Sequence, residues 1–132
     1  MIKGLNHVAI AVNKLDEALE VFDHQLGWKL EKTRVVEQQK IKAALLRVGD
    51  TKIELLEPTG ADSTVAKFLE KRGEGIHHIA VTVSDIEGHL EELKEKGIAL
   101  IDEKPRVGME GGKIAFIHPK STKNVLIELV EP

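Results

Sequence analysis

The sequence predicts an α+β fold made of two tandem βαβββ modules. Three observations lead to this prediction: one segment occurs twice, apolar and polar residues alternate where strands are expected, and each copy carries a helical stripe of apolar residues. The two copies are LNHVAIAVNKLDEALEVF, from Leu5, and IHHIAVTVSDIEGHLEEL, from Ile76. Their alignment places His7 on His78. KIELLEP, residues 52–58, recurs in the same way as LIELVEP in the second copy.

The two copies set the expected domain organisation. A chain of roughly 55 residues buries its own core poorly, so copies of this length are expected to pack or pair with each other. We therefore expect one domain over residues 1–132. The first module covers residues 4–58, a linker with a short helix covers 59–74, and the second module covers 75–132.

Local signals place the elements of the first module and the linker. HVAIAV alternates with period two and predicts a strand. Asn13 is a candidate cap for a helix from about Lys14 to His24. A short linker helix is expected from Ser63 to Arg72. The remaining strands of the first module are expected at residues 28–37, 41–48 and 52–57.

The second module repeats this order. Ser84 and Glu87 have the spacing of a capping box. The helix that follows is expected to run to Lys96 and to stop at Gly97. The remaining strands are expected near residues 98–103, 113–118 and 125–131.

The composition argues against several classes of function. A net charge of −3 and a pI near 6.1 argue against nucleic acid as a partner, because phosphate binding needs a dense basic surface. No apolar run approaches the ~18 residues of a membrane span. The absence of cysteine excludes disulfides, thiolate metal sites and cysteine nucleophiles. The first residues enter a strand pattern at once, so no targeting segment and a cytoplasmic location are expected.

The first strand of each module has one bulky apolar face and one face that carries a histidine. Successive side chains of a strand point to opposite faces, so His7 shares its face with two alanines. His78 shares its face with Ala80 and Thr82 in the same way. Because small neighbours leave open space, we interpret these faces as the wall of a cavity.

Glu54 and Glu128 occupy matching positions between apolar residues in the closing strands. A buried carboxylate is costly unless it is paired or bound to a metal. The repeat supplies a partner twice, because one histidine and one glutamate recur in each module. Two imidazoles and two carboxylates predict a site for one divalent metal ion of the hard or borderline kind, which can be cobalt, manganese, nickel, iron, zinc or magnesium.

Several other titratable residues are expected to lie outside this site. His77 is expected to be structural, because it points to the opposite face of its strand. His24 and His89 are expected on the surfaces of helices. Glu57 and Glu131 follow the candidate ligands by three residues, so they are expected to face the other way and to contact solvent.

Paired βαβββ modules with histidine and glutamate at these positions resemble the vicinal oxygen chelate superfamily, which includes glyoxalase I, extradiol dioxygenases and fosfomycin-resistance proteins. NHVAIAV, TKIELLEPTGADSTVAKFLEKRGEGIHHIAV and FIHPKSTKNVLIELVE are similar to the methylmalonyl-CoA epimerase family in particular, and the similarity covers essentially the whole chain. The resemblance implies a glyoxalase-like fold, in which a mixed sheet curls into a half-barrel around the metal. It also implies a homodimer and a small-molecule acyl-CoA substrate.

The resemblance also assigns roles to residues. The family's metal ligands fall on His7, Glu54, His78 and Glu128. Its catalytic carboxylates fall on Glu37 and Glu128. The implied reaction removes the hydrogen α to a thioester carbonyl and returns it on the opposite face, which needs two bases and a cation that stabilises the enolate charge. On the repeat alignment Glu37 falls opposite Glu110, which is the alternative second base.

Two other functions stay open on the sequence. Glyoxalase I shares the ligand set and also moves a proton next to a carbonyl, whereas FLEKRGEGIHHIAV and IHPK favour the epimerase. A metal-free binding or resistance protein of the same fold would have little reason to carry ligand-type residues at all four positions. A dioxygenase is disfavoured, because such enzymes usually use two histidines and one carboxylate.

Overall fold

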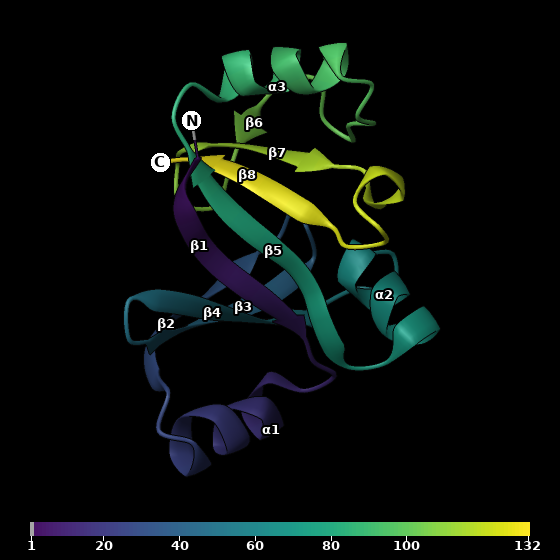
Figure 1. Cartoon of the computed structure of the whole chain (residues 1–132). Helices are drawn as coiled ribbons and strands as arrows, with labels where there is room; N and C mark the ends of the chain where they lie inside the picture. Colours follow the sequence, from purple (N-terminus) through teal and green to yellow (C-terminus); the bar gives the residue numbers. More distant parts are fainter. Residues whose placement is uncertain (1) are drawn as a thin grey trace. The chain divides into compact units, whose positions relative to one another are not determined.

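The computed structural model describes residues 2–132 of the chain (Figure 1). The elements of the first part are β1 (Ile2–Ala11), α1 (Leu15–Leu19), η1 (Glu20–Gln25), β2 (Lys29–Val36), β3 (Ile41–Val48) and β4 (Thr51–Pro58). They are followed by α2 (Thr64–Arg72), β5 (Gly75–Val83), α3 (Ile86–Glu95), β6 (Arg106–Val107), β7 (Lys113–Ile117), η2 (Pro119–Ser121) and β8 (Ile127–Glu131). Both parts follow the βαβββ order that the sequence predicts.

The strands form a mixed sheet in the order β2-β3-β4-β1-β5-β8-β7-β6. β1 is parallel to β4 and β5 is parallel to β8, whereas the hairpin pairs are antiparallel. The chain divides into two compact units. The first unit is His7–His77, and the second joins His78–Pro132 to the start of β1, as far as Asn6. The module boundaries at residues 58 and 75 stay a prediction.

The core of the first unit lies between α1 and the sheet. Its buried members are Val12, Leu15, Ala18, Ala44, Leu46 and Leu55. Phe22 and Trp28 pack against this cluster, with their ring centroids 5.2 Å apart. Ile53 also packs against it. Because Ile53 and Leu55 face the core, Glu54 between them points to the opposite face of the sheet.

The second unit has a core of the same design. Its buried members are Val83, Ile86, Leu90, Ala115, Ile117 and Leu129. Ile86 and Leu90 come from α3, and Ile127 packs against the cluster from β8. Because Ile127 and Leu129 both face this core, Glu128 points to the opposite face of its strand. The repeated sequence pattern therefore gives the same strand orientation twice.

The first helix differs from its prediction. α-Helical hydrogen bonding covers only Leu15–Leu19, and Glu20–Gln25 continue as a π-helix. In this wider turn the N–H of Leu26 donates to the carbonyl of Val21 at 2.9 Å. Apolar spacing indicates that the segment is helical, but it does not distinguish hydrogen bonds to the fourth residue back from those to the fifth.

The cap of α3 is another local prediction that is wrong. Asp85 is the N-cap, with a φ of 52°, and its carboxylate accepts a hydrogen bond from the N–H of Gly88 at 3.2 Å. The capping box expected from Ser84 and Glu87 therefore does not form the helix start, because the chain enters α3 one residue later.

The strand expected at residues 98–103 is reduced to an isolated bridge between Leu100 and Ile117. The Asp102 carboxylate accepts the N–H of Phe116 at 2.9 Å, and the N–H groups of Ile101 and Asp102 both donate to the Phe116 carbonyl. The Asp102 side chain and a shared carbonyl acceptor thus replace regular strand pairing with β7 at this point. Regular pairing on this edge of β7 is limited to the two-residue strand β6.

The linker helix agrees with its prediction. α2 begins after Ser63, whose hydroxyl oxygen accepts the N–H of Ala66 at 2.9 Å. It ends at Gly73, where a φ of 76° favours glycine. No helix within residues 2–132 has the length and apolar character needed to cross a membrane.

Candidate metal centre

The first unit contains a buried histidine–glutamate pair. His7 lies in β1 and Glu54 in β4, and the parallel pairing of these strands sets Ala9 opposite Glu54. The Nε2 atom of His7 lies 3.6 Å from Oε1 of Glu54. Each residue is only 7% exposed. The small side chain of Ala9 leaves room for the two polar side chains to approach each other on this face.

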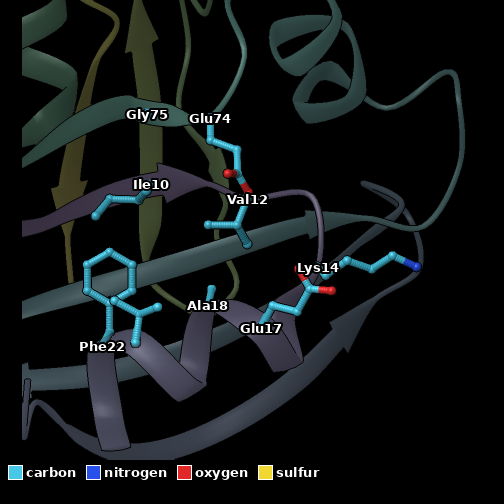
Figure 2. Close-up of a pocket in the computed structure, with 9 residues that line it drawn as sticks. Ile10, Val12, Lys14, Glu17, Ala18, Phe22, Glu74 and Gly75 are labelled. Carbon is cyan, nitrogen blue, oxygen red and sulfur yellow. The ribbon is translucent and has the colours of Figure 1, made fainter. Parts of the chain in front are cut away.

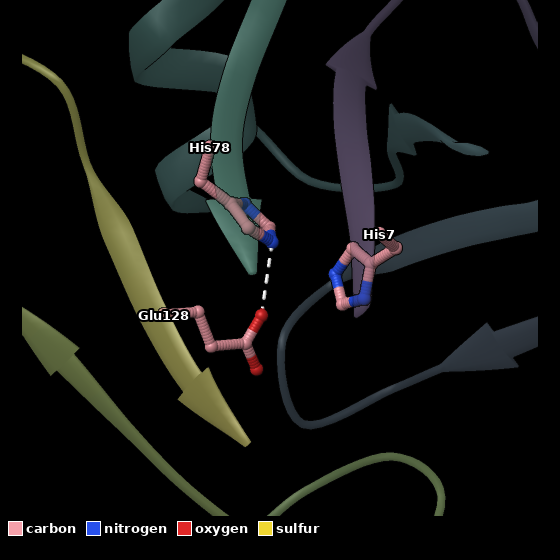
Figure 3. A group of neighbouring side chains, drawn as sticks. All are labelled: His7, His78 and Glu128. Carbon is pink, nitrogen blue, oxygen red and sulfur yellow. Dashed lines mark ion pairs between the residues drawn. The ribbon is translucent and has the colours of Figure 1, made fainter. Parts of the chain in front are cut away.

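The second unit contains the equivalent pair (Figure 3). His78 lies in β5 and Glu128 in β8, and these strands are again parallel, with Ala80 opposite Glu128. The Nε2 atom of His78 lies 3.0 Å from Oε1 of Glu128, the ion pair drawn as a dashed line in Figure 3. Both residues are buried. Each unit therefore carries one imidazole and one carboxylate in matching positions.

The chemistry of these side chains fits a divalent metal ion. Imidazole nitrogen and carboxylate oxygen are ligands of borderline and hard divalent cations, and the chain has no cysteine that would favour a soft ion. Burial of a carboxylate is costly without a compensating positive charge. Within the second unit, His78 and Glu128 are both ligand-type side chains that could hold a metal ion. A divalent metal is thus supported, and which ion it is stays a prediction.

Glu57 and Glu131 have a structural role that the sequence reasoning missed. Glu57 accepts a hydrogen bond from the N–H of Leu15 at 2.6 Å, and Glu131 accepts one from the N–H of Ile86 at 2.7 Å. Each glutamate therefore satisfies the first turn of the helix in its own unit, where a negative charge is favourable. The prediction that they simply contact solvent is wrong. The sequence did contain a signal for this role, because in both copies a second glutamate follows the candidate ligand by three residues.

The two candidate bases outside the buried pairs lie in turns. Glu37 is exposed in the turn between β2 and β3, where its carbonyl accepts the N–H of Lys40. Glu110 is exposed in the turn between β6 and β7. Both are therefore placed at the corresponding hairpin of their units, as the repeat alignment indicates.

The other histidines lie apart from the buried pairs. His77 is half-buried and packs against Phe68 of α2, with ring centroids 5.0 Å apart. His24 is exposed in η1, as expected. His89 was also expected at the surface, but it is half-buried in α3. His77 therefore has the packed environment of a structural residue.

An aromatic and a basic residue flank the second pair, and the sequence reasoning did not identify them. Phe116 lies directly opposite Glu128 in the β7–β8 pairing. Its ring stands perpendicular to the His78 imidazole, with centroids 5.5 Å apart. The guanidinium of Arg106 lies over the same ring, 5.5 Å from its centroid. The sequence offered one signal for this contact. Phe116 begins the motif FIHP, at the end of the strand that precedes the closing strand.

A separate pocket of about 380 Å³ lies on the helix side of the first unit (Figure 2). Its lining residues are Ile10, Val12, Lys14, Glu17, Ala18, Val21, Phe22, Glu74 and Gly75. Ile10 and Val12 alternate along the chain with Ala9 and Ala11, which share the face of His7. The pocket is therefore on the opposite side of the sheet from the His7–Glu54 pair and is not part of the metal centre.

Comparison with known proteins defines the class. Residues 6–116 match the Glyoxalase/Bleomycin resistance protein/Dioxygenase superfamily. The chain belongs to this superfamily.

Within that superfamily, the chain belongs to the methylmalonyl-CoA epimerase family. The human mitochondrial methylmalonyl-CoA epimerase is 37% identical over 95% of this chain and 72% of the human protein. The crystal structure of the Mycobacterium tuberculosis methylmalonyl-CoA epimerase is 43% identical, with a TM-score of 0.92 over 99% of this chain and 89% of that one. A methylmalonyl-CoA epimerase in complex with methylmalonyl-CoA and NH4+ is 36% identical, with a TM-score of 0.93 over 99% and 95%. The predicted glyoxalase-like fold is confirmed.

Proposed function

We propose that this chain is an isomerase that interconverts the (R) and (S) epimers of methylmalonyl-CoA. The observation that carries the proposal is a buried histidine–glutamate pair at the same position of both units, in a chain that belongs to the epimerase family. Epimerisation at this carbon requires removal of the hydrogen α to the thioester carbonyl and its return to the opposite face. The barrier is the negative charge that develops on the thioester oxygen.

In this proposal His7, Glu54, His78 and Glu128 together hold one divalent metal ion. The bound ion would supply the positive charge that stabilises the thioester oxygen as the α-hydrogen leaves. The burial of all four side chains supports this assignment, because it excludes water that would compete for the ion. Cobalt is the first candidate, with manganese, nickel, zinc, iron and magnesium as alternatives.

The proposed bases are Glu37 and Glu128. A carboxylate exchanges a proton without forming a covalent adduct, and one base on each face of the carbon is sufficient for inversion. Glu128 can serve both as ligand and as base, because a carboxylate that binds through one oxygen keeps a second oxygen for the proton. Glu37 enters through the family resemblance, and the repeat alignment makes Glu110 its alternative.

The decisive experiment is proton NMR of methylmalonyl-CoA in deuterated buffer with the purified protein. We expect the α-hydrogen signal to disappear, and we expect its loss to stop after chelation and to return when cobalt is added. Persistence of the signal with metal-loaded protein would reject epimerisation.

The alternatives are tested in parallel. Turnover of the glutathione hemithioacetal in place of methylmalonyl-CoA would indicate glyoxalase I chemistry. Tight ligand binding without turnover, in a metal-free preparation, would indicate a binding or resistance protein.

Three further parts of the proposal concern assembly, location and partners. The family resemblance supports a homodimer, which size-exclusion chromatography with light scattering would test. A cytoplasmic location stays a prediction, and the human relative is a mitochondrial protein. The acidic net charge supports a small-molecule partner in place of nucleic acid.

A further inference from the structure

We propose that Phe116 is a positioning residue for His78, and that Asp102 and Arg106 hold Phe116 in place. This inference rests on the proposed metal-dependent function, because it assigns Phe116 the task of orienting one metal ligand. All of these residues belong to the second unit.

Phe116 contacts His78 in a defined geometry. The two rings are nearly perpendicular, at 88°, with centroids 5.5 Å apart, which is the edge-to-face arrangement that aromatic rings prefer. Phe116 is also the residue opposite Glu128 in the β7–β8 pairing, so its side chain lies on the same face of the sheet as the pair. The ring of Phe116 therefore limits the rotation of the imidazole beside Glu128.

Phe116 is itself held at both its backbone and its ring. Oδ2 of Asp102 accepts the N–H of Phe116 at 2.9 Å, and Oδ1 of Asp102 lies 3.2 Å from Nε of Arg106. The guanidinium of Arg106 covers the ring, with Cζ 5.5 Å from the centroid. The side chain of Asp102 is only 16% exposed, so one largely buried carboxylate fixes both contacts. Phe116 is thus held by a backbone hydrogen bond and by a cation–π contact in addition to ordinary packing.

The contact matters because Phe116 touches the imidazole ring and leaves its ligand nitrogen uncovered. Nε2 of His78 lies 3.0 Å from Oε1 of Glu128, so this nitrogen is the one that faces the proposed metal. The edge-to-face contact with Phe116 therefore orients the ring without occupying Nε2. Outer partners that orient a ligand ring through hydrogen bonds typically change metal affinity by about 10–100-fold, and we place this aromatic contact at the lower end of that range.

The first unit offers a contrast at its own pair. The residue opposite Glu54 in the β3–β4 pairing is Leu45, where the second unit has an aromatic ring. The distance from His7 Nε2 to Glu54 Oε1 is 3.6 Å, longer than the 3.0 Å of the second pair. The tighter pair is the one that has the aromatic neighbour.

The chain also contains a matched control. Phe68 packs against His77 with ring centroids 5.0 Å apart, and the guanidinium of Arg72 lies 5.7 Å from the Phe68 centroid. The arrangement of arginine, phenylalanine and histidine is thus repeated around a histidine that is not a proposed ligand. A substitution there removes the same kind of contact without touching a ligand.

The test compares Phe116→Leu with Phe68→Leu in the full chain. The metal-free proteins are titrated with cobalt against a competing chelator, and the visible absorption of bound cobalt reports the coordination geometry. We expect Phe116→Leu to weaken cobalt binding about tenfold and to alter the absorption spectrum. We expect Phe68→Leu to leave both within twofold of the unsubstituted protein. Unchanged affinity in Phe116→Leu, or an equal loss in both variants, would overturn the proposal.

A second pair of variants covers the case in which Phe116→Leu does not fold. Arg106→Met leaves the ring and removes its anchor, and we expect it to weaken cobalt binding about threefold, whereas Arg72→Met should not. Equal cobalt affinity in these two variants would contradict the proposal. Absence of cobalt binding by the unsubstituted protein would instead refute the proposed metal centre itself.

Discussion

Glu54 and Glu57 are three residues apart in KIELLEP, and the structure gives them separate tasks. Glu54 pairs with His7 on one face of β4, and Glu57 accepts the N–H of Leu15 at the start of α1. We therefore predict that Glu57→Ala lowers the stability of the chain but leaves metal binding intact. Glu54→Leu should instead lose metal binding, because it removes the ligand oxygen from the His7–Glu54 pair.

The structure sets the size of the first effect. A hydrogen bond to a charged group contributes ~1.5–3 kcal/mol, and loss of a helix N-cap costs ~0.5–2 kcal/mol. Glu57 is only half-buried, so water replaces part of the lost bond. We expect a loss of about 1.5 kcal/mol. At about 4 °C per kcal/mol for a domain of this size, the Tm should fall by about 6 °C.

The assay is thermal unfolding with and without added cobalt. A ligand that binds only the folded state stabilises it by about 2.7 kcal/mol at a hundredfold excess over Kd, so cobalt should raise the Tm of Glu57→Ala as much as that of the unsubstituted protein. It should not raise the Tm of Glu54→Leu. A Glu57→Ala variant that keeps its Tm, or one that loses the cobalt response, would refute the assignment of the two glutamates.

Three more predictions concern the catalytic turn, a crowded glycine and a surface ion pair. Glu37→Gln should abolish interconversion of the two epimers while metal content by elemental analysis is unchanged; undiminished turnover would remove Glu37 from the mechanism. Gly112→Ala should cost about 2 kcal/mol in urea unfolding, because a Cβ there would lie 2.6 Å from the carbonyl oxygen of Glu131, and a neutral effect would contradict this packing. The hydrogen bond from Lys113 lowers the pKa of Glu87 below its ordinary 4.5, so the pair stabilises the fold above that pH and loses this effect as the pH falls through the lowered pKa. Lys113→Met should therefore be less stable than the unsubstituted protein at neutral pH and equal to it in acid, and a difference independent of pH would argue against the pair.

The strand predictions succeed where a strand has one apolar face. β3 spans Ile41–Val48, as the sequence predicts, because its alternation and its flanking turns are both local signals. The strand predicted at residues 98–103 does not form as predicted, because its pairing depends on a contact that is distant in the sequence. Its pairing with β7 is interrupted by the Asp102 carboxylate, which bonds to a residue 14 positions away. No local pattern reveals such a contact.

The candidate ligands could be found from the sequence because the chain contains its own internal comparison. One strand glutamate is uninformative, but Glu54 and Glu128 in the same phrase, each with a histidine in a matching strand, indicate a shared role. The helix caps could not be found in this way. Glu57 is 42 positions from Leu15, and only the folded chain brings them together.

The sequence by itself determined the two βαβββ modules and the faces on which the polar residues of each strand lie, because strand alternation and repeat alignment depend only on neighbouring residues. Only the tertiary structure decided that the second glutamate of each phrase caps a helix, that six residues of the first helix wind as a π-helix, and that Phe116 stands against His78. These features depend on contacts between segments that are distant in the chain, and on competition between side-chain and backbone hydrogen bonds, which the folded geometry alone resolves.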